Sequence, residues 1–243
     1  MDSDKQTILL KKTANLLVGT HDFRNLAHQA ADLVVKELKD KNLIGASVFR
    51  LHEQENLVYA YTYANKYRKL IDALLPAKFS QLNISLSATN NLVVKTILTN
   101  QIQQSQSLAD FSKGALPESL TDKIQKIMRA KLFATLPIRL KSGKVAGVIL
   151  LALNNPQLSG EQLVLFEVFA DQLGLAFSNI MEFERLMAKY QNLTKRFLAS
   201  EEDAPSVKFT LRITPKENEK LEKLARDKKR TKAEIIRDFL DEV

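Results

Sequence analysis

The sequence predicts an α+β protein with three parts: an antiparallel sheet with flanking helices, a long helix, and a small strand–helix–helix unit at the C-terminus. Three observations lead to this prediction. Two pairs of strand-like segments flank a mixed middle region, residues 160–199 contain no proline, and the chain then begins a new strand pattern after a short break. The order of these patterns indicates two folded parts connected by a helix.

Composition limits the classes of protein to consider. The chain has 243 residues, of which 45% are hydrophobic and 26% charged, as in an ordinary globular protein of one or two domains. It has no cysteine, which excludes a disulfide framework, a thiolate metal site and a cysteine nucleophile. The net charge of +8 favours a polyanionic partner, either nucleic acid or an acidic membrane surface.

Hydropathy indicates a cytoplasmic protein without a membrane-spanning segment. The longest apolar run, residues 145–153, is far shorter than the roughly 20 residues that cross a bilayer. The first residues, MDSDKQTILLKK, contain no signal-peptide core.

The first elements are expected to be helices followed by a hairpin. Residues 1–20 are predicted to form an N-terminal helix, and a second helix is expected from about Asp22 to Asp40, because its apolar residues recur every three or four positions. The segments IGASVFRL and NLVYAYTYA then form a predicted hairpin around the turn HEQE. The side chains alternate most clearly at Leu57, Tyr59, Tyr61 and Tyr63.

The middle region, from Asn65 to Arg129, has a mixed pattern. Short helices are expected at YRKLIDALL and NLVVKTILTN, and a loop is expected around Lys113, Gly114 and Pro117. Long irregular connections inside a compact domain are usually functional, often as a lid over a pocket. The strands KLFATLPIRL and VAGVILLAL then complete the predicted sheet.

Residues 160–199 are expected to form one helix with an apolar seam whose members are three and four positions apart. Up to Ile180 the seam is expected to pack on the sheet. Beyond residue 182 no sheet remains to be covered, so a coiled coil with a second copy is expected to bury Phe183, Met187, Tyr190 and Phe197. Residues 200–205 are a predicted linker, since an acidic run and Pro205 end the helix.

The order of elements in about residues 21–186 resembles the GAF domain, and residues 21–182 are expected to form it. The likeness is carried by ASVFRLHEQENLVYAYTYA, by NNLVVKTILTNQIQQSQSLADF as a helix and following strand, and by the stretch from LFATLPIRL to EFERL. The resemblance implies helices on one face of the sheet and, on the other, a pocket roofed by the middle region. GAF domains bind cyclic nucleotides, bilins, haem, amino acids or other metabolites, and some only dimerise.

The ligand does not follow from this resemblance, and the pocket residues stay unassigned. There is no cysteine for a bilin or for the methionine sulfoxide reductases of this fold, and no Asn-Lys-x-Phe-Asp-Glu type motif of the cyclic-nucleotide binders. A non-covalent small-molecule ligand therefore remains open, as does a domain that binds none. Because His21, His28 and His52 lack metal-ligand spacing, and no nucleophile elbow, P-loop or paired catalytic carboxylates occur, neither a metal site nor an enzyme is expected.

Residues 206–243 resemble the ribbon-helix-helix DNA-binding domain. Apolar Val207, Phe209, Leu211 and Ile213 alternate with polar residues, Thr214 and Pro215 begin a helix with Glu217 placed for a capping box, and Thr231 is the expected cap of a second helix. One copy cannot bury a lone apolar strand. The resemblance implies that two chains pair their strands through Phe209, Leu211 and Ile213.

The same resemblance implies how DNA would be bound. The paired strands would enter the major groove with Lys208, Thr210 and Arg212 toward the base edges. The start of the last helix, with Arg230, Thr231 and Lys232, would bind phosphate. A solvent-facing edge strand shows the same polar alternation, so the prediction rests on the caps and both helices appearing in order.

These patterns together predict a homodimeric, DNA-binding transcriptional regulator whose GAF-like domain senses a small molecule or serves as a dimerisation platform. The alternative is a ligand-free GAF scaffold whose ribbon-helix-helix acts like an antitoxin and holds a partner protein. Assembly of dimers into higher-order complexes on double-stranded DNA stays open.

Overall fold

The computed structural model describes residues 22–199, 213–228 and 230–241. The chain divides into two compact units, Met1–Phe183 and Glu184–Val243. The predicted N-terminal helix of residues 1–20 and the linker of residues 200–205 lie outside the described residues.

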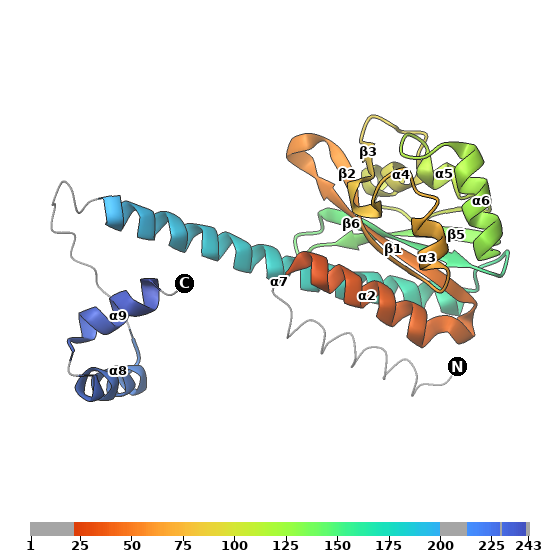
Figure 1. Ribbon diagram of the computed structural model, residues 1–243. Coiled ribbons are helices and arrows are strands. Elements are labelled where there is room, and N and C mark those ends of the chain that lie inside the picture. The colour runs from red at the N-terminus through yellow and green to blue at the C-terminus, as the bar shows by residue number, and fades with distance from the viewer. Residues whose placement is uncertain (1–21, 200–212, 229, 242–243) are drawn as a thin grey trace. The chain divides into compact units, whose positions relative to one another are not determined.

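The first unit contains a six-stranded antiparallel sheet in the order β3-β2-β1-β6-β5-β4 (Figure 1). Its strands are β1 (Leu43–His52), β2 (Leu57–Asn65), β3 (Asn83–Ser85), β4 (Gln103–Ser105), β5 (Leu132–Arg139) and β6 (Val145–Leu153). The two predicted hairpins are confirmed and lie side by side, because β1 pairs with β6. The resemblance to the GAF domain also implied a strand where β4 lies, whereas β3 was not predicted.

Two helices cover one face of the sheet, as Figure 1 shows: α2 (Phe23–Leu38) and the first part of α7 (Gly160–Ala199). Asp22 caps α2 by accepting hydrogen bonds from the amides of Arg24 and Asn25. The apolar seam of α7 is buried against this face up to Ile180, as predicted, whereas Val164 and Leu175 lie off the seam and are exposed. Phe23 and Phe177 join the two helices, with ring centroids 3.9 Å apart.

Helix α7 is also apolar in composition. Within the described residues, its Gly160–Asn192 portion is the one helix long and apolar enough to cross a membrane. Half of its most apolar window is buried inside the protein, and the core helix of a globular domain meets the same criterion.

Gly174 allows α7 to lie directly on the backbone of β5. A Cβ atom at this position would be 1.8 Å from the carbonyl oxygen of Arg139, so no larger residue fits without moving the helix. Next to this contact, the amide of Lys141 donates a hydrogen bond to Ser178 Oγ at 2.9 Å, and Lys141 Nζ donates one to Asn179 Oδ1 at 2.8 Å. The turn between β5 and β6 is thereby attached to α7.

The opposite face of the sheet is covered by residues 68–128, named here the roof segment (Figure 1). Besides β3 and β4 it contains α3 (Arg68–Asp72), a 3₁₀ turn η3 (Phe79–Gln81), α4 (Leu92–Thr99), α5 (Ala109–Ser112) and α6 (Glu118–Met128). The predicted short helices correspond to α3 and α4. The sequence prediction missed α6, although Leu120, Ile124 and Met128 recur at helical spacing and pack on the sheet.

A β-bulge changes the direction of side chains along β2. The pairing of β1 with β2 shifts between Val48 and Phe49, which leaves Tyr61 as the extra residue. Tyr61 therefore faces α2, whereas Tyr63 faces the roof segment. The predicted alternation from Leu57 to Tyr63 is wrong at its last position, because an added residue reverses the faces of all residues beyond it.

Candidate functional site

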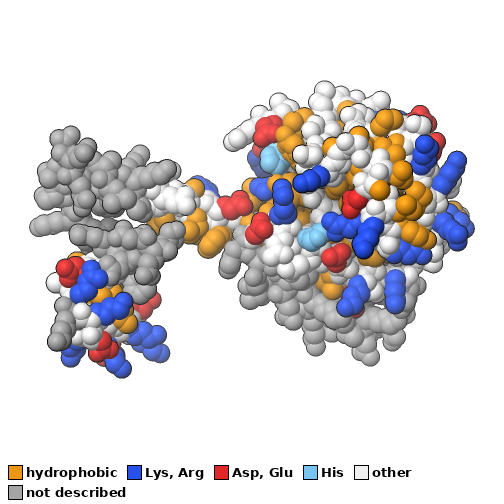
Figure 2. Space-filling view, viewed as in Figure 1, with side chains coloured by type: hydrophobic (Ala, Val, Ile, Leu, Met, Phe, Trp, Pro, Cys, Tyr) orange, Lys and Arg blue, Asp and Glu red, His pale blue; other side chains and the backbone are white. Residues whose placement is uncertain are grey.

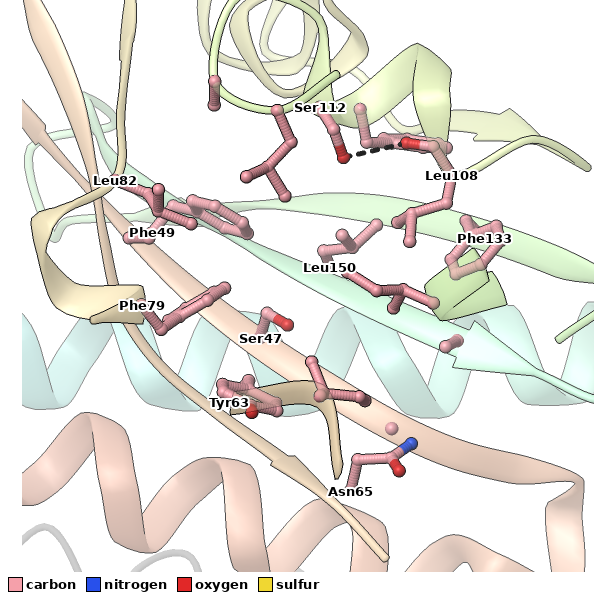
Figure 3. Close-up of a pocket in the computed structure, with 18 of the residues that line it drawn as sticks. Ser47, Phe49, Tyr63, Asn65, Phe79, Leu82, Leu108, Ser112, Phe133 and Leu150 are labelled. Carbon is pink, nitrogen blue, oxygen red and sulfur yellow. Dashed lines mark hydrogen bonds between the residues drawn. The ribbon is translucent and has the colours of Figure 1, made fainter. Parts of the chain in front are cut away.

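A cavity of about 90 Å³ lies between the sheet and the roof segment. Its floor comes from β1, β2, β5 and β6, and its roof from α3, η3, α5 and α6 (Figure 3). Three aromatic rings line one side, since the ring centroid of Phe79 is 4.7 Å from that of Tyr63 and 6.0 Å from that of Phe49. The lining is mostly apolar, and within the described residues it includes no Lys, Arg, His, Asp or Glu.

Most polar side chains of the lining are bound within the fold. The hydroxyl of Tyr63 donates to Asp72 Oδ1 at 2.6 Å, and Asn65 Nδ2 donates to the carbonyl of Ile44 at 2.7 Å. Ser112 Oγ donates to the carbonyl of Leu108 at 3.0 Å, the contact dashed in Figure 3. Burial, and then the bond to Asp72, raises the pKa of Tyr63 well above its ordinary value near 10, so this phenol stays protonated at neutral pH.

Ser47 lies at the centre of the cavity floor. It pairs with Tyr63 on β2 and with Leu150 on β6, and Figure 3 shows its hydroxyl between these two residues. Its side chain makes no hydrogen bond to any other described residue. The hydroxyl of Ser47 is therefore available to a molecule in the cavity.

Asn91 holds the roof segment together. Its side chain is fully buried and caps α4, with Oδ1 accepting from the amide of Val93 at 2.8 Å. Its Nδ2 donates to the carbonyls of Phe111 at 3.1 Å and Lys113 at 2.8 Å, at the end of α5. Sequence reasoning missed this residue, although an asparagine before the apolar run LVV is a recognisable cap signal.

Arg139 connects the roof segment to α7. Its Nε donates to Oδ1 of Asn100, the residue that ends α4, at 2.8 Å, and its Nη1 lies 3.3 Å from Asp171 Oδ1 on α7. Because its backbone also touches Gly174, Arg139 links a helix on the cavity face to the helix on the other face. Arg139 therefore contacts both the end of α4 and α7.

The histidines have ordinary structural partners. His28 Nδ1 is hydrogen-bonded to Thr62 Oγ1, and its Nε2 lies 3.4 Å from a nitrogen of Arg68. His52 Nε2 lies 3.5 Å from the hydroxyl of Tyr61. His21 lies outside the described residues.

The predicted dimer seam on α7 lies beyond the part that packs on the sheet. Phe183 is 39% exposed and Tyr190 61% exposed, whereas Met187 is partly buried. The side chain of Phe197, like Phe209 and Leu211, lies outside what is described, and Ile213 is exposed.

The second unit contains two helices that pack on each other, α8 (Pro215–Asp227) and α9 (Lys232–Asp241). Both predicted caps are present. Thr214 and Glu217 form a reciprocal capping box, with the Glu217 amide donating to Thr214 Oγ1 at 3.3 Å and the Thr214 amide donating to Glu217 Oε2 at 2.7 Å. Thr231 and Glu234 repeat this arrangement at the start of α9.

The residues expected to bind phosphate lie at the start of α9. Arg230 and Thr231 are exposed, and the amide of Thr231 donates to Glu234 Oε2 at 2.8 Å. Lys232 Nζ donates to Glu222 Oε1 and Asn218 Oδ1 on α8, so this lysine connects the two helices. The residues expected to read bases, Lys208, Thr210 and Arg212, lie outside the described residues.

Charge on the first unit is mixed on the face that Figure 2 presents. Lys and Arg side chains are spread among hydrophobic and acidic ones instead of forming one continuous patch. The net charge of the chain therefore does not by itself mark a nucleic-acid groove on this face.

A six-stranded antiparallel sheet, with helices on one face and a roofed cavity on the other, defines a class of α+β domains. The class is the GAF fold, and solved structures with this fold resemble the chain. The GAF domain of an Acinetobacter phosphoenolpyruvate-protein phosphotransferase is 14% identical with a TM-score of 0.54, over 75% of this chain and 97% of that chain.

Two further structures are similar in fold. The phycoerythrobilin-bound GAF domain of a cyanobacterial phytochrome is 13% identical with a TM-score of 0.52, over 74% of this chain and 97% of that chain. The free methionine-R-sulfoxide reductase of Neisseria meningitidis, solved with its substrate, is 9% identical with a TM-score of 0.52, over 75% of this chain and 95% of that chain.

No family model matches the chain, and no curated protein matches it. At these identities the likeness establishes the fold alone. The predicted GAF fold is therefore confirmed, and the ribbon-helix-helix resemblance stays a prediction from the sequence.

Proposed function

We propose that the protein is a homodimeric DNA-binding transcriptional regulator in which a GAF-fold domain senses a small molecule. The DNA-binding half rests mainly on the strand–helix–helix pattern of residues 206–243. Reciprocal capping boxes at the start of both helices support it, because they fix the helix boundaries where the ribbon-helix-helix resemblance puts them.

Charge near the second helix also supports DNA binding. Residues 226–232, RDKKRTK, contain five basic residues and one acidic residue. Such a basic stretch before a helix N-terminus suits the phosphate backbone, which attracts both the side chains and the helix dipole. Lys232 Nζ already donates to Glu222 Oε1 on α8, so a phosphate contact by this lysine would have to replace that bond.

The homodimer is supported by the exposed aromatic residues of α7. Phe183 and Tyr190 follow the buried seam at the same helical spacing but lie beyond its contact with the sheet. A second copy of the same helix would bury them in a coiled coil. A ligand that binds one dimer arrangement better would shift the crossing of the two helices, and with it the spacing of the DNA-binding ends.

The test of DNA binding is a titration of the full chain with genomic DNA fragments over a salt series. The variant Arg212→Ala is compared with Lys220→Ala, which removes the same charge from the solvent-facing side of α8. We expect Arg212→Ala to abolish sequence selectivity with a small change in salt slope, and Lys220→Ala to keep selectivity. Unselective binding that Arg212→Ala leaves unchanged would refute base reading by the ribbon.

A second candidate function is favoured by the small size of the cavity. Ligand pockets usually measure about 300–1,000 Å³, whereas this cavity is about 90 Å³. A domain without a ligand would act as a dimerisation platform, and its C-terminal unit would hold a partner protein. Co-purification of one protein in a fixed ratio, together with unselective DNA binding, would favour this function.

A further inference from the structure

The absence of charge in the cavity restricts what it can hold. None of its described lining residues carries a charge at neutral pH, and Asp72, which follows the lining residue Ile71 on the roof segment, is already bound by the hydroxyl of Tyr63. Arg68 Nε lies 3.8 Å from the same carboxylate. An ionic ligand would lose its hydration in the cavity without gaining a counter-charge, which is strongly unfavourable.

The hydrogen-bonding capacity of the cavity is equally limited. Tyr63, Asn65 and Ser112 are each bound to other groups of the fold. Asn83, the remaining polar side chain of the lining besides Ser47, is exposed to solvent and donates to the carbonyl of Gln81 at 3.4 Å. Ser47, in the centre of the floor, has a hydroxyl that can both donate and accept. A ligand that fits this cavity therefore has one polar group, placed over Ser47, and an apolar remainder against Phe79, Tyr63 and Leu150.

The volume sets the size of that ligand. At about 90 Å³ the cavity is smaller than the apolar cavity of about 150 Å³ that takes up benzene in another protein. A single ring or a short alkyl chain needs only small side-chain movements of the roof, whereas a bilin or a nucleotide is several times too large.

We infer that the cavity binds a small, uncharged, largely apolar molecule of about single-ring size through one hydrogen bond to the hydroxyl of Ser47. This inference rests on the sensory part of the proposed function and names its class of ligand. It requires no residue of the second unit and no DNA.

The experiment measures binding of four probes to the full chain by calorimetry and by NMR of labelled methyl groups. Phenol is the neutral, hydroxyl-bearing probe, toluene has the same ring without a hydroxyl, and benzoate carries a negative charge at similar size. Benzylamine carries a positive charge. We expect phenol to bind at least tenfold more tightly than benzoate or benzylamine.

The variant Ser47→Ala tests the hydrogen bond. We expect it to weaken phenol binding about three- to tenfold and to leave toluene binding unchanged, because toluene cannot use the hydroxyl. The matched control is Ser142→Ala, which removes the same hydroxyl from the exposed turn between β5 and β6 and should change neither affinity.

Three results would overturn the inference. In the first, benzoate or benzylamine binds as tightly as phenol. In the second, Ser47→Ala lowers the affinity for toluene as much as the affinity for phenol. In the third, neither phenol nor toluene binds at millimolar concentration. Because DNA selectivity is measured on the protein without probes, each of these results would leave the DNA-binding proposal intact. Conversely, selective phenol binding by a protein that does not select DNA would refute the proposed regulator and keep the inference.

Discussion

Replacing Asn91 by alanine should destabilise the GAF-fold unit by about 2–4 kcal/mol. The side chain is fully buried and makes two kinds of contact, a cap on α4 and two donated hydrogen bonds to the carbonyls of Phe111 and Lys113. Loss of a cap costs about 1 kcal/mol, and leaving a buried carbonyl without a donor costs about 1–3 kcal/mol. Only the carbonyl of Phe111 is counted in full, because the contact with Lys113 is partly exposed to water. For a domain of this size the melting temperature should fall by roughly 2–4 °C per kcal/mol.

Two further variants separate these contributions. Asn91→Ser keeps a capping oxygen but cannot reach the carbonyls, so it should lose about 1–3 kcal/mol. Asp22→Ala removes the exposed cap of α2 and should lose about 1 kcal/mol. Urea unfolding of all three gives the free energies, and hydrogen exchange reports whether the roof segment opens first. If Asn91→Ala cost no more than Asp22→Ala, the two carbonyl contacts would not hold the roof segment.

Three other predictions concern α7, Tyr63 and the dimer. Gly174→Ala should lose about 1–3 kcal/mol of unfolding free energy despite the better helix propensity of alanine, because the new methyl group would meet the Arg139 carbonyl. Gly160→Ala, whose Cβ meets nothing within 4 Å, is its control, and equal stability of the two variants would contradict the close contact. The raised pKa of Tyr63 contributes stability that is present below about pH 10, where an unfolded tyrosine keeps its proton, and is lost as pH rises above it. Between about pH 9 and about pH 11, the unfolding free energy measured in urea should therefore fall less for Tyr63→Phe than for the parent protein. Equal falls would contradict a raised pKa of Tyr63 in the folded state. Tyr190→Glu should weaken self-association, measured by sedimentation, at least tenfold. The control Gln191→Glu adds the same charge one residue further along and should have little effect. Equal effects of the two variants would argue against a place for Tyr190 in the dimer seam.

Much of the fold could be predicted because its signals are local. The hairpin of β1 and β2, the strands β5 and β6, and the buried part of α7 follow from side-chain periodicity over single elements. The caps at Thr214 and Thr231 follow from residues only three positions apart.

The roof segment was harder to predict, because its elements are short and gain stability from the sheet beneath them and from one another. Helix α6 is mostly polar, so its four apolar residues were too weak a signal to separate it from a loop. The role of Asn91 depends on α5 lying next to α4, a contact between segments about twenty residues apart.

The sequence by itself determined the antiparallel α+β architecture, the boundaries of its main elements, the helix caps and the lack of cysteine chemistry. Only the tertiary structure decided what the cavity can bind. The bulge at Tyr61 directs Tyr63 inward, the roof segment reduces the space to about 90 Å³, and pairing across three strands puts Ser47 at its centre. Periodicity shows which residues of one element face the core. The size and charge of a cavity depend on which distant residues meet there, and packing of the whole chain decides which residues these are.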